Sequence, residues 1–425
     1  MISAARARSP DTDFGATGQL TAFQSPRFRI DPTPADDSPY VKLEIVTQRQ
    51  DFDALEAEWS ALYDRAGRPG NPFQSFAWCW HWANHFLKGR DATTEKSELF
   101  ILTGRTGARL TMIWPMVRER SRGLRTLTWL GAPVTQYGDV LVEGGDKLRM
   151  LREAWQFLRS NANADIIALY KVREDAAVAP LLAEIGAVAT HKDRAPYVDM
   201  SQSETFEDYA DKRYSKKRKS YLRRYRRRFE DIAPVRTDVL SEGQEARAVT
   251  DELLRFKQEW LTRKSMVSRA LHDPRTRDFF LDTVTDTTRR TGCRITTMRC
   301  GEELVGAKLN YVAKGRAVAH VITYNLAYDK WNPGHLTTYA GLEACKKHGI
   351  DVFDFMGPCA PFKLDWADDS VEVNDWAVPL SMKGSLWTRV YLGYARDRLK
   401  AAHMALPASL KRLTSPMLST ILMVA

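Results

Sequence analysis

The sequence predicts an α+β protein of two related lobes, each with a mixed, mostly antiparallel sheet flanked by helices. Two observations predict this fold. Segments with helical periodicity alternate with short apolar strand patterns along the whole chain. The order of helices, antiparallel strands and a strand–helix–strand unit occurs once before residue 200 and again after it. At 425 residues, 44% of them hydrophobic, the chain can form two cores, which we expect at 41–200 and 201–385.

The first half opens with two helices and continues with strands. Apolar residues at three- and four-residue spacing predict the first helix, and an aromatic-rich run predicts the second. Gly-containing turns separate the strands that follow. We expect helices at 51–66, 71–87 and 146–160, and strands at 98–104, 108–117, 124–131, 137–143 and 164–172.

The second half repeats this order. Pro274 suits the first turn of a helix, and Gly349 suits a helix end because it tolerates a left-handed backbone. We expect helices at 241–264, 274–291 and 334–349, and strands at 293–300, 304–312, 317–325 and 350–357.

The two ends of the chain are not expected to belong to either lobe. Residues 1–40 are rich in Ser, Thr, Pro and Asp, which predicts a disordered leader, and 386–425 are expected to form a helical tail. No apolar run approaches the roughly 20 residues that span a bilayer. The five cysteines show no metal-site or disulfide spacing. We therefore expect reduced thiols, no bound metal and a cytoplasmic protein.

A strongly basic segment accounts for the net charge of the chain. Residues 212–228 hold eleven basic and no acidic side chains; removing them from the total of +10 leaves −1. We expect a helix over 212–230, with Tyr214, Tyr221, Leu222, Tyr225 and Phe229 on one face. Because like charges on a helix repel, this segment is expected to meet an anion, such as lipid headgroups, diphosphates or tRNA. DNA is disfavoured, since no DNA-binding motif is present.

A Pro-Gly turn lies between a strand and a helix near residue 333. The start of a helix exposes unpaired amides and the positive end of its dipole, so it attracts anions. Gly334 has no side chain to keep a phosphate from the backbone. The turn is either a simple helix cap or a site that binds a phosphate. The residues of such a site would be Asn332, Pro333, Gly334, His335 and Leu336.

The context of this turn resembles a known family. A strand meander, this turn, a helix and one more strand resemble the GNAT acyltransferase core, in which the turn binds the pyrophosphate of a coenzyme A thioester. The ordered pieces NPFQSFAWCWHW, SKKRKSYLRRYRRRFED, FKQEWLTRK, NPGHL and FDFMGPCAPFKLDW resemble the CelD-like acetyltransferases associated with cellulose biosynthesis. These are related to FemAB-type aminoacyl transferases. The resemblance covers about residues 41–380, but DKWNPGHL lacks the usual Gln/Arg-x-x-Gly-x-Gly/Ala pattern.

Three residues are candidates for the chemistry that this resemblance implies. His320 lies in the strand before the turn, where a near-neutral imidazole suits a general base. Tyr324 shares its face if the strand is regular and would protonate the departing thiolate. Asp354, between Phe353 and Phe355, is the other candidate base. Structural roles are also open: core packing for His320 and Tyr324, and a buried ion pair for Asp354.

Candidate substrate-binding residues lie around these positions. In the related aminoacyl transferases a basic segment lies near the acceptor, which favours an acidic glycan precursor or a membrane surface here. Tryptophan faces stack on sugars, and Lys363 would hold an acidic acceptor or a donor phosphate; surface or core roles remain open for all of them. The candidates are Lys216, Arg218, Arg223, Trp260, Lys363 and Trp366.

The sequence thus predicts an enzyme that transfers an acetyl or other acyl group from an acyl-CoA. The acceptor would be a hydroxyl or amine of a polysaccharide or lipid-linked glycan precursor, with peripheral contact to anionic membrane through 212–228. One alternative is a FemAB-like transferase that uses aminoacyl-tRNA. Another is a non-catalytic scaffold in exopolysaccharide synthesis. The first lobe is expected to be structural, because it has no equivalent of NPGHL.

Overall fold

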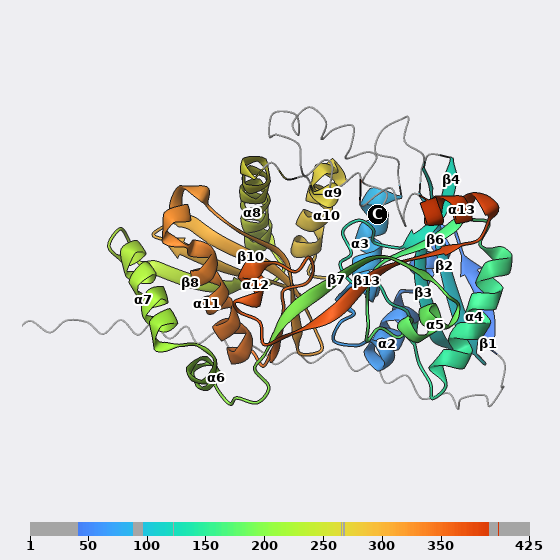
Figure 1. Ribbon diagram of the computed structural model, residues 1–425, viewed down its shortest axis with the longest axis horizontal. Helices are drawn as coiled ribbons and strands as arrows, with labels where there is room; N and C mark the ends of the chain where they lie inside the picture. The colour runs from blue at the N-terminus through green and yellow to red at the C-terminus, as the bar shows by residue number, and fades with distance from the viewer. Residues whose placement is uncertain are drawn as a thin grey trace, which may run out of the picture.

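A computed structural model describes residues 41–87, 97–121, 123–264, 266, 268–390 and 398. The strands of this part of the chain form one mixed sheet (Figure 1) in the order β1-β2-β3-β4-β6-β13-β7-β12-β11-β10-β9-β8, with β5 paired to β3. The strands are β1 (Val41–Val46), β2 (Glu98–Thr106), β3 (Arg109–Ser121), β4 (Leu124–Trp129), β5 (Leu141–Val142), β6 (Ile166–Arg173), β7 (Val188–Asp199), β8 (Val235–Leu240), β9 (Cys293–Cys300), β10 (Glu303–Ala313), β11 (Arg316–Tyr324), β12 (Val352–Asp354) and β13 (Asp369–Pro379).

Helices flank both faces of this sheet, which confirms the predicted α+β class. Two 3₁₀ turns, η1 (Pro72–Gln74) and η2 (Leu326–Trp331), accompany them. The helices are α1 (Arg49–Ala54), α2 (Glu56–Ala66), α3 (Phe76–Phe86), α4 (Lys147–Asn161), α5 (Ala179–Glu184), α6 (Phe206–Arg213), α7 (Lys216–Glu230), α8 (Gln244–Arg263), α9 (Arg269–His272), α10 (Pro274–Thr285), α11 (Pro333–Lys347), α12 (Pro361–Leu364) and α13 (Met382–Leu386).

The two halves of the chain interlock at the centre of the sheet. Strand β7 comes from the first half, yet it pairs with β12 of the second half. Strand β13 comes from the end of the second half, yet it pairs with β6 of the first. Both strands run through the middle of the molecule in Figure 1. The halves therefore share one continuous sheet instead of two separate ones, and the boundary at residue 200 stays a prediction.

One large hydrophobic core lies on one face of this sheet. It joins side chains of α1, α2 and α3 with those of α8 and α10, so both halves contribute to it. Trp78 of α3, for example, packs edge-on against Phe279 of α10 with ring centroids 4.9 Å apart. The opposite face has two cores, one under α4 and α5 and one under α6, α7 and α11. The halves are therefore joined by packing as well as by strand pairing.

The predicted basic helix 212–230 is wrong at its start, because the segment forms two helices. Tyr214 has an extended backbone and is buried, which ends α6 at Arg213. Ser215 then accepts a hydrogen bond from the amide of Arg218 and caps α7. The predicted apolar face is otherwise present, with Leu222 and Phe229 buried.

Several expected elements differ in extent. The strand predicted at 137–143 is reduced to β5, and the one at 350–357 to β12. The helix predicted at 274–291 ends at Thr285, whereas Gly349 ends α11 with a positive φ of 71°, as expected. The predicted leader and most of the predicted tail lie outside the described residues. None of the helices described is long and apolar enough to cross a bilayer.

Candidate active site

His320 occupies a bulge in β11. Its neighbours pair with consecutive residues of β10, Ala319 with Asn310 and Val321 with Leu309, so His320 is the extra residue. His320 and Tyr324 were predicted to share one face on the condition that the strand is regular. The bulge makes β11 irregular, so this condition is not met. Instead, His320 reaches the first half of the chain, where its Nε2 lies 2.7 Å from the carbonyl oxygen of Val134.

The contacts of His320 leave one basic nitrogen unpaired. A carbonyl oxygen only accepts, so Nε2 carries the proton and Nδ1 holds the lone pair. Nδ1 is buried without a hydrogen-bond partner among the described residues. Aromatic rings, including those of Trp78 and Phe280, surround the imidazole. Desolvation lowers the pKa of His320 to about 4, so the ring is neutral at physiological pH.

The helix mouth at Gly334 is partly capped by its own chain. Asn332 adopts a left-handed backbone (φ 52°), and its carbonyl oxygen accepts from the amides of His335 (3.1 Å) and Leu336 (3.4 Å). Of the amides of Gly334, His335 and Leu336, only that of Gly334 has no hydrogen-bond partner in the described chain. The side-chain amide of Asn332 donates to the Tyr221 hydroxyl (2.6 Å), which ties the turn to the basic helix α7.

A cavity of about 290 Å³ opens beside this turn; we call it the donor cavity. A Cβ atom added at Gly334 would lie 3.3 Å from the ring of Tyr324, so the glycine keeps this wall open. The Tyr324 hydroxyl donates to Asp329, and burial raises its pKa to about 12. The cavity is lined by Lys257, Trp260, Lys264, Ile322, Thr323, Tyr324, Asn332, Gly334, His335, Thr338, Phe362 and Trp366.

Two of the predicted substrate-binding side chains form a stack at the edge of this cavity. The guanidinium carbon of Arg218 lies 4.1 Å from the ring centroid of Trp366, and Nη1 donates to the carbonyl oxygen of Asp365 (2.8 Å). Trp260, another predicted residue, lines the same cavity, with the Lys257 ammonium 4.5 Å from its ring centroid. The structure therefore brings Trp366 and Trp260 to the donor cavity, with Arg218 stacked on Trp366.

A second cavity of about 290 Å³ lies between the halves; we call it the inter-lobe cavity. It shares Lys257, Ile322 and Phe362 with the donor cavity, so the two adjoin. His320 and the predicted residue Lys363 both line it. Its other lining residues include Gln136 and Lys171 from the first half. The first half therefore supplies polar side chains to a candidate site, beyond the structural role expected for it.

Asp354 lies in a buried ionic cluster that joins the halves. Tyr137 donates to its Oδ1 (2.7 Å), while Arg173 and Arg316 each donate to its Oδ2 (3.0 Å). The amide of Met356 also donates to Oδ1 (2.8 Å). The carboxylate is fully buried. With both oxygens occupied, this geometry favours the structural role; the base role stays a prediction without support from these contacts.

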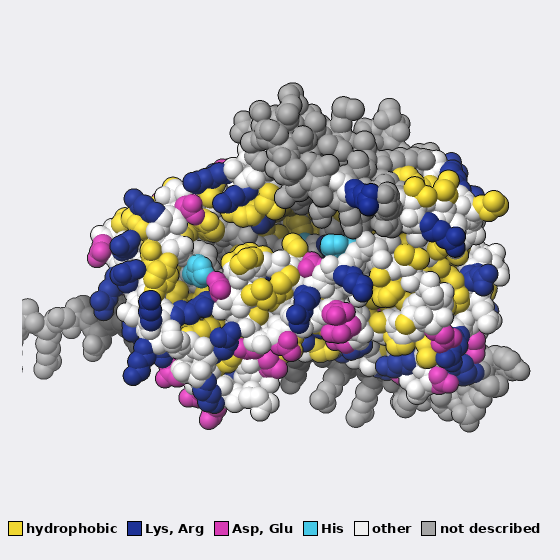
Figure 2. Space-filling view, in the orientation of Figure 1, with side chains coloured by type: hydrophobic (Ala, Val, Ile, Leu, Met, Phe, Trp, Pro, Cys, Tyr) yellow, Lys and Arg dark blue, Asp and Glu magenta, His cyan; other side chains and the backbone are white. Residues whose placement is uncertain are grey.

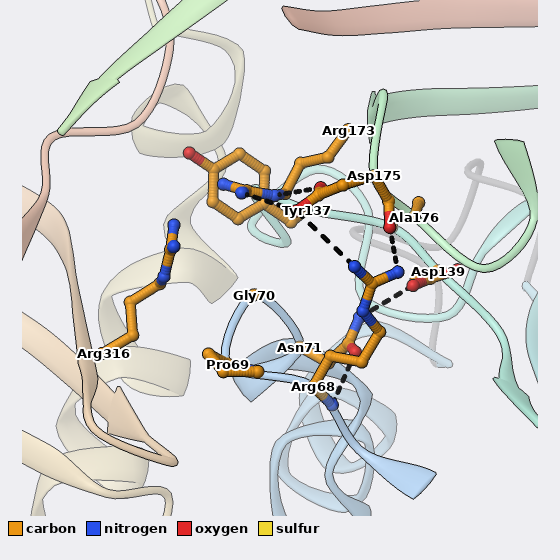
Figure 3. A pocket seen from close by; sticks show the side chains of 11 residues that line it. Arg68, Pro69, Gly70, Asn71, Tyr137, Asp139, Arg173, Asp175, Ala176 and Arg316 are labelled. Atoms are coloured by element: carbon orange, nitrogen blue, oxygen red, sulfur yellow. Dashed lines mark hydrogen bonds and ion pairs between the residues drawn. The ribbon is translucent and has the colours of Figure 1, made fainter. Parts of the chain in front are cut away.

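A third cavity, of about 240 Å³, borders this cluster (Figure 3). Three arginines line it, but carboxylates neutralise them. Arg68 pairs with Asp175 at 3.6 Å, and Arg173 donates to the same carboxylate at 2.8 Å. Asn71 in turn donates to the buried Asp139 (3.1 Å). These mutual pairs fit an internal structural network better than a ligand site.

Several lysines in or near these cavities were not predicted from the sequence. Lys257, which borders both cavities, lies in the motif FKQEWLTRK, but no role was predicted for it. Lys171 and Lys308 lie in apolar strand patterns, where a charged residue is the one available signal. Lys308 is fully buried, donates to Thr338 of the donor cavity, and has a pKa lowered to about 7 by desolvation. Lys216 and Arg223, by contrast, are exposed on α7 and line none of the three cavities.

Comparison with known proteins agrees with this architecture. Residues 216–364 match the model of the acetyltransferase (GNAT) domain. No curated protein matches the chain. Among solved structures, FemX aligns over 82% of this chain and 99% of its own, with 11% identity and a TM-score of 0.53.

Two further structures align with lower TM-scores. L-PGS from Bacillus licheniformis shares 15% identity over 78% of this chain and 95% of its own, with a TM-score of 0.48. A tandem GNAT protein from the clavulanic acid biosynthesis pathway shares 14% identity over 80% of this chain and 99% of its own, with a TM-score of 0.45. At such identities the likeness to FemX shows a shared fold and no activity, and these two weaker likenesses carry no argument.

The matched region contains the features from which a donor site was expected. It spans the basic helix α7, the bulged strand β11, the turn at Gly334 and helix α12. The scaffold alternative, which supposed no catalysis, is therefore not favoured. Residues 216–364 thus correspond to a GNAT acetyltransferase domain, and this match supports an acyltransferase activity.

Proposed function

We propose that this protein transfers an acyl group from acetyl-CoA or another acyl-CoA, bound in the donor cavity, to a hydroxyl or amine in the inter-lobe cavity. One observation carries this proposal. The cavity beside the helix mouth and the cavity beside His320 share Lys257, Ile322 and Phe362. A thioester held at the mouth and an acceptor held between the halves would therefore meet at this junction.

The donor cavity suits the phosphates of coenzyme A. The unpaired amide of Gly334 lies in the first turn of a 15-residue helix, whose dipole favours an anion there. Lys264 lines the same cavity, and α7 meets the turn through Tyr221. Figure 2 shows Lys and Arg side chains gathered over α7. These positive groups would favour the phosphate-rich end of the donor.

The chemistry would proceed by direct attack of the acceptor on the thioester. As its oxygen or nitrogen bonds to the carbonyl carbon, the acceptor's proton passes to Nδ1 of His320. The carbon–sulfur bond then breaks, and the thiolate takes a proton from Tyr324 at the donor side. Because His320 is neutral and unpaired at Nδ1, it is ready to accept a proton without prior deprotonation.

Donor binding is the first test. Titration calorimetry with acetyl-CoA, longer acyl-CoAs and free CoA is expected to show saturable binding to the native chain. In Gly334→Val the added side chain meets the ring of Tyr324 and fills the mouth, so we expect at least a tenfold loss of affinity. Gly145→Val is the matched control, because a Cβ at Gly145 meets nothing within 4 Å. Equal donor affinity in the two variants would remove the donor cavity from this role.

The acceptor is proposed from the resemblance to CelD-like enzymes. It would be a polysaccharide or lipid-linked glycan precursor, modified on the cytoplasmic side during cellulose or other exopolysaccharide synthesis. The exposed cations of α7 would bring the enzyme to an anionic membrane surface.

A second candidate donor is aminoacyl-tRNA. It is favoured by the resemblance of the sequence to FemAB-type transferases, together with the exposed cations of α7. In this case binding measured by filter retention should weaken about 10³-fold or more between 50 and 200 mM salt, because several phosphate contacts release counterions. Arg223→Glu with Arg227→Glu should weaken it further. Salt-independent binding, or none, would exclude this donor.

A further inference from the structure

The inter-lobe cavity is lined by three lysines and by no acidic residue of the described chain. Lys257 comes from α8, Lys363 from α12 and Lys171 from β6, so the positive charges converge from three separate elements. Gln136 completes the polar wall on the side of the first half, where the Lys171 ammonium donates to its side-chain oxygen (2.5 Å). A cavity with three cations and no carboxylate in its wall attracts an anion.

Two of these lysines are buried or half-buried, and the partners of their ammonium groups are neutral carbonyl oxygens. The ammonium of Lys363, 8% exposed, donates to the carbonyl oxygen of Met356 (2.7 Å). That of Lys257 donates to the carbonyl oxygen of Ile322 at 3.4 Å. Neither lysine has an ion-pair partner within the described chain. Desolvation lowers both pKa values, that of Lys363 to about 8.

Nearby carboxylates are committed elsewhere. Both oxygens of Asp354 bind the ionic cluster described above. Asp193 accepts from the amides of Arg194 (2.8 Å) and Cys359 (3.0 Å). Both lie near enough to favour protonated Lys363 electrostatically, but neither lines the cavity. An anion that enters the cavity would therefore be the first negatively charged group to contact the ammonium groups of Lys257 and Lys363 directly.

We propose that the inter-lobe cavity selects an acceptor that carries a carboxylate or a phosphate. Lys257 and Lys363 bind this group from one half of the chain, and Lys171 with Gln136 binds it from the other. The inference rests on the proposed acyl transfer and names the class of its acceptor. The anionic group would anchor the acceptor across the two halves, so that its hydroxyl or amine lies beside His320.

The cavity's anion is assigned to the acceptor because the donor has its own anion site. The mouth at Gly334 belongs to the donor cavity and does not line the inter-lobe cavity. Lys363 and Lys171 line only the inter-lobe cavity of the two. Lys257 alone among the three lysines borders both, at the junction where the acyl group would pass.

The test compares three probes that share a sugar ring and differ in charge: glucose, glucuronate and glucose 6-phosphate. Titration calorimetry on the full chain is expected to show at least tenfold tighter binding of a charged probe than of glucose. Lys363→Gln should remove about tenfold of that affinity, whereas Lys363→Arg keeps the charge and should retain most of it. Lys192→Gln, at an exposed lysine of β7, is the matched control and should bind as the native chain does.

The outcomes separate this inference from the proposed function. Binding of a charged probe that persists in Gly334→Val and is lost in Lys363→Gln supports the site, even if acyl-CoA fails to bind. If Lys363→Gln is unfolded by its melting profile, Lys257→Gln replaces it in the same comparison. Tighter binding of glucuronate or of glucose 6-phosphate identifies the group as carboxylate or phosphate. Charged probes that bind no better than glucose, or a loss that occurs only in Gly334→Val, would overturn the inference.

Discussion

His320→Gln is expected to lower kcat for acyl transfer by about 10²–10⁴-fold while donor affinity stays within about twofold. Glutamine can still donate to the carbonyl oxygen of Val134, as Nε2 of the histidine does, so the contact across the halves survives. What it lacks is the basic nitrogen that Nδ1 supplies. Steady-state kinetics with a saturating acyl-CoA, together with donor calorimetry, measures the two effects separately.

A purely structural His320 predicts a different result. In that case the variant would lose stability and rate together, and kcat of the folded fraction would stay near native. Kinetics below the melting range of the variant therefore decides between the roles. A kcat within twofold of the native value would exclude His320 as the base.

The acid stability of the same variant gives an independent check. Burial lowers the pKa of His320 to about 4, whereas an unfolded histidine titrates near 6.5. Between these values the unfolded chain binds one more proton than the folded chain, so the histidine makes stability fall as pH drops from about 6.5 to 4. His320→Gln should lose less stability than the native chain over this window in denaturant titrations. Parallel profiles would show that the imidazole is not held neutral.

Asp354→Asn is expected to lower the free energy of unfolding by about 3–5 kcal/mol. The substitution keeps the shape of the side chain but removes the charge that Arg173 and Arg316 share. Two largely buried guanidinium groups would then face a neutral amide at the junction of the halves. Urea unfolding of the full chain measures the change.

The matched control for this effect is Asp278→Asn. Asp278 is exposed and, among the described residues, makes only a 3.5 Å ion pair with Arg277, so we expect a change below about 0.5 kcal/mol. The comparison also tests the role predicted for Asp354 from the sequence. A stable Asp354→Asn variant with a strongly reduced kcat would restore the carboxylate as a base and contradict the structural assignment.

Local patterns of the sequence determined much of the fold. Apolar periodicity located α8, α11 and the strands β9, β10 and β11, because the alternation of buried and exposed side chains is written into neighbouring residues. The same local reasoning located the turn at Gly334 and the apolar face of α7. Each of these features depends on residues within a few positions of one another, and the sequence alone therefore determined them.

The tertiary structure decided what depends on distant partners. Strands β7 and β13 were not predicted, and only pairing across the halves shows that each completes the sheet of the other half. The bulge that turns His320 toward Val134 depends on the register of β11 against β10. Asp354 pairs with Arg173, which is 181 positions away in the sequence, and is therefore part of an ionic cluster.

The residues of the inter-lobe cavity also differ in whether the sequence or only the tertiary structure identified them. Lys363 was a candidate from its motif, whereas Lys171 and Lys257 line the same cavity only because three distant elements meet there. The sequence determined that this chain has a Pro-Gly turn at the start of a helix, a basic helix and alternating α and β elements. Which side chains face one another across the halves was decided by the tertiary structure, because packing and long-range electrostatics leave no periodic trace in the sequence.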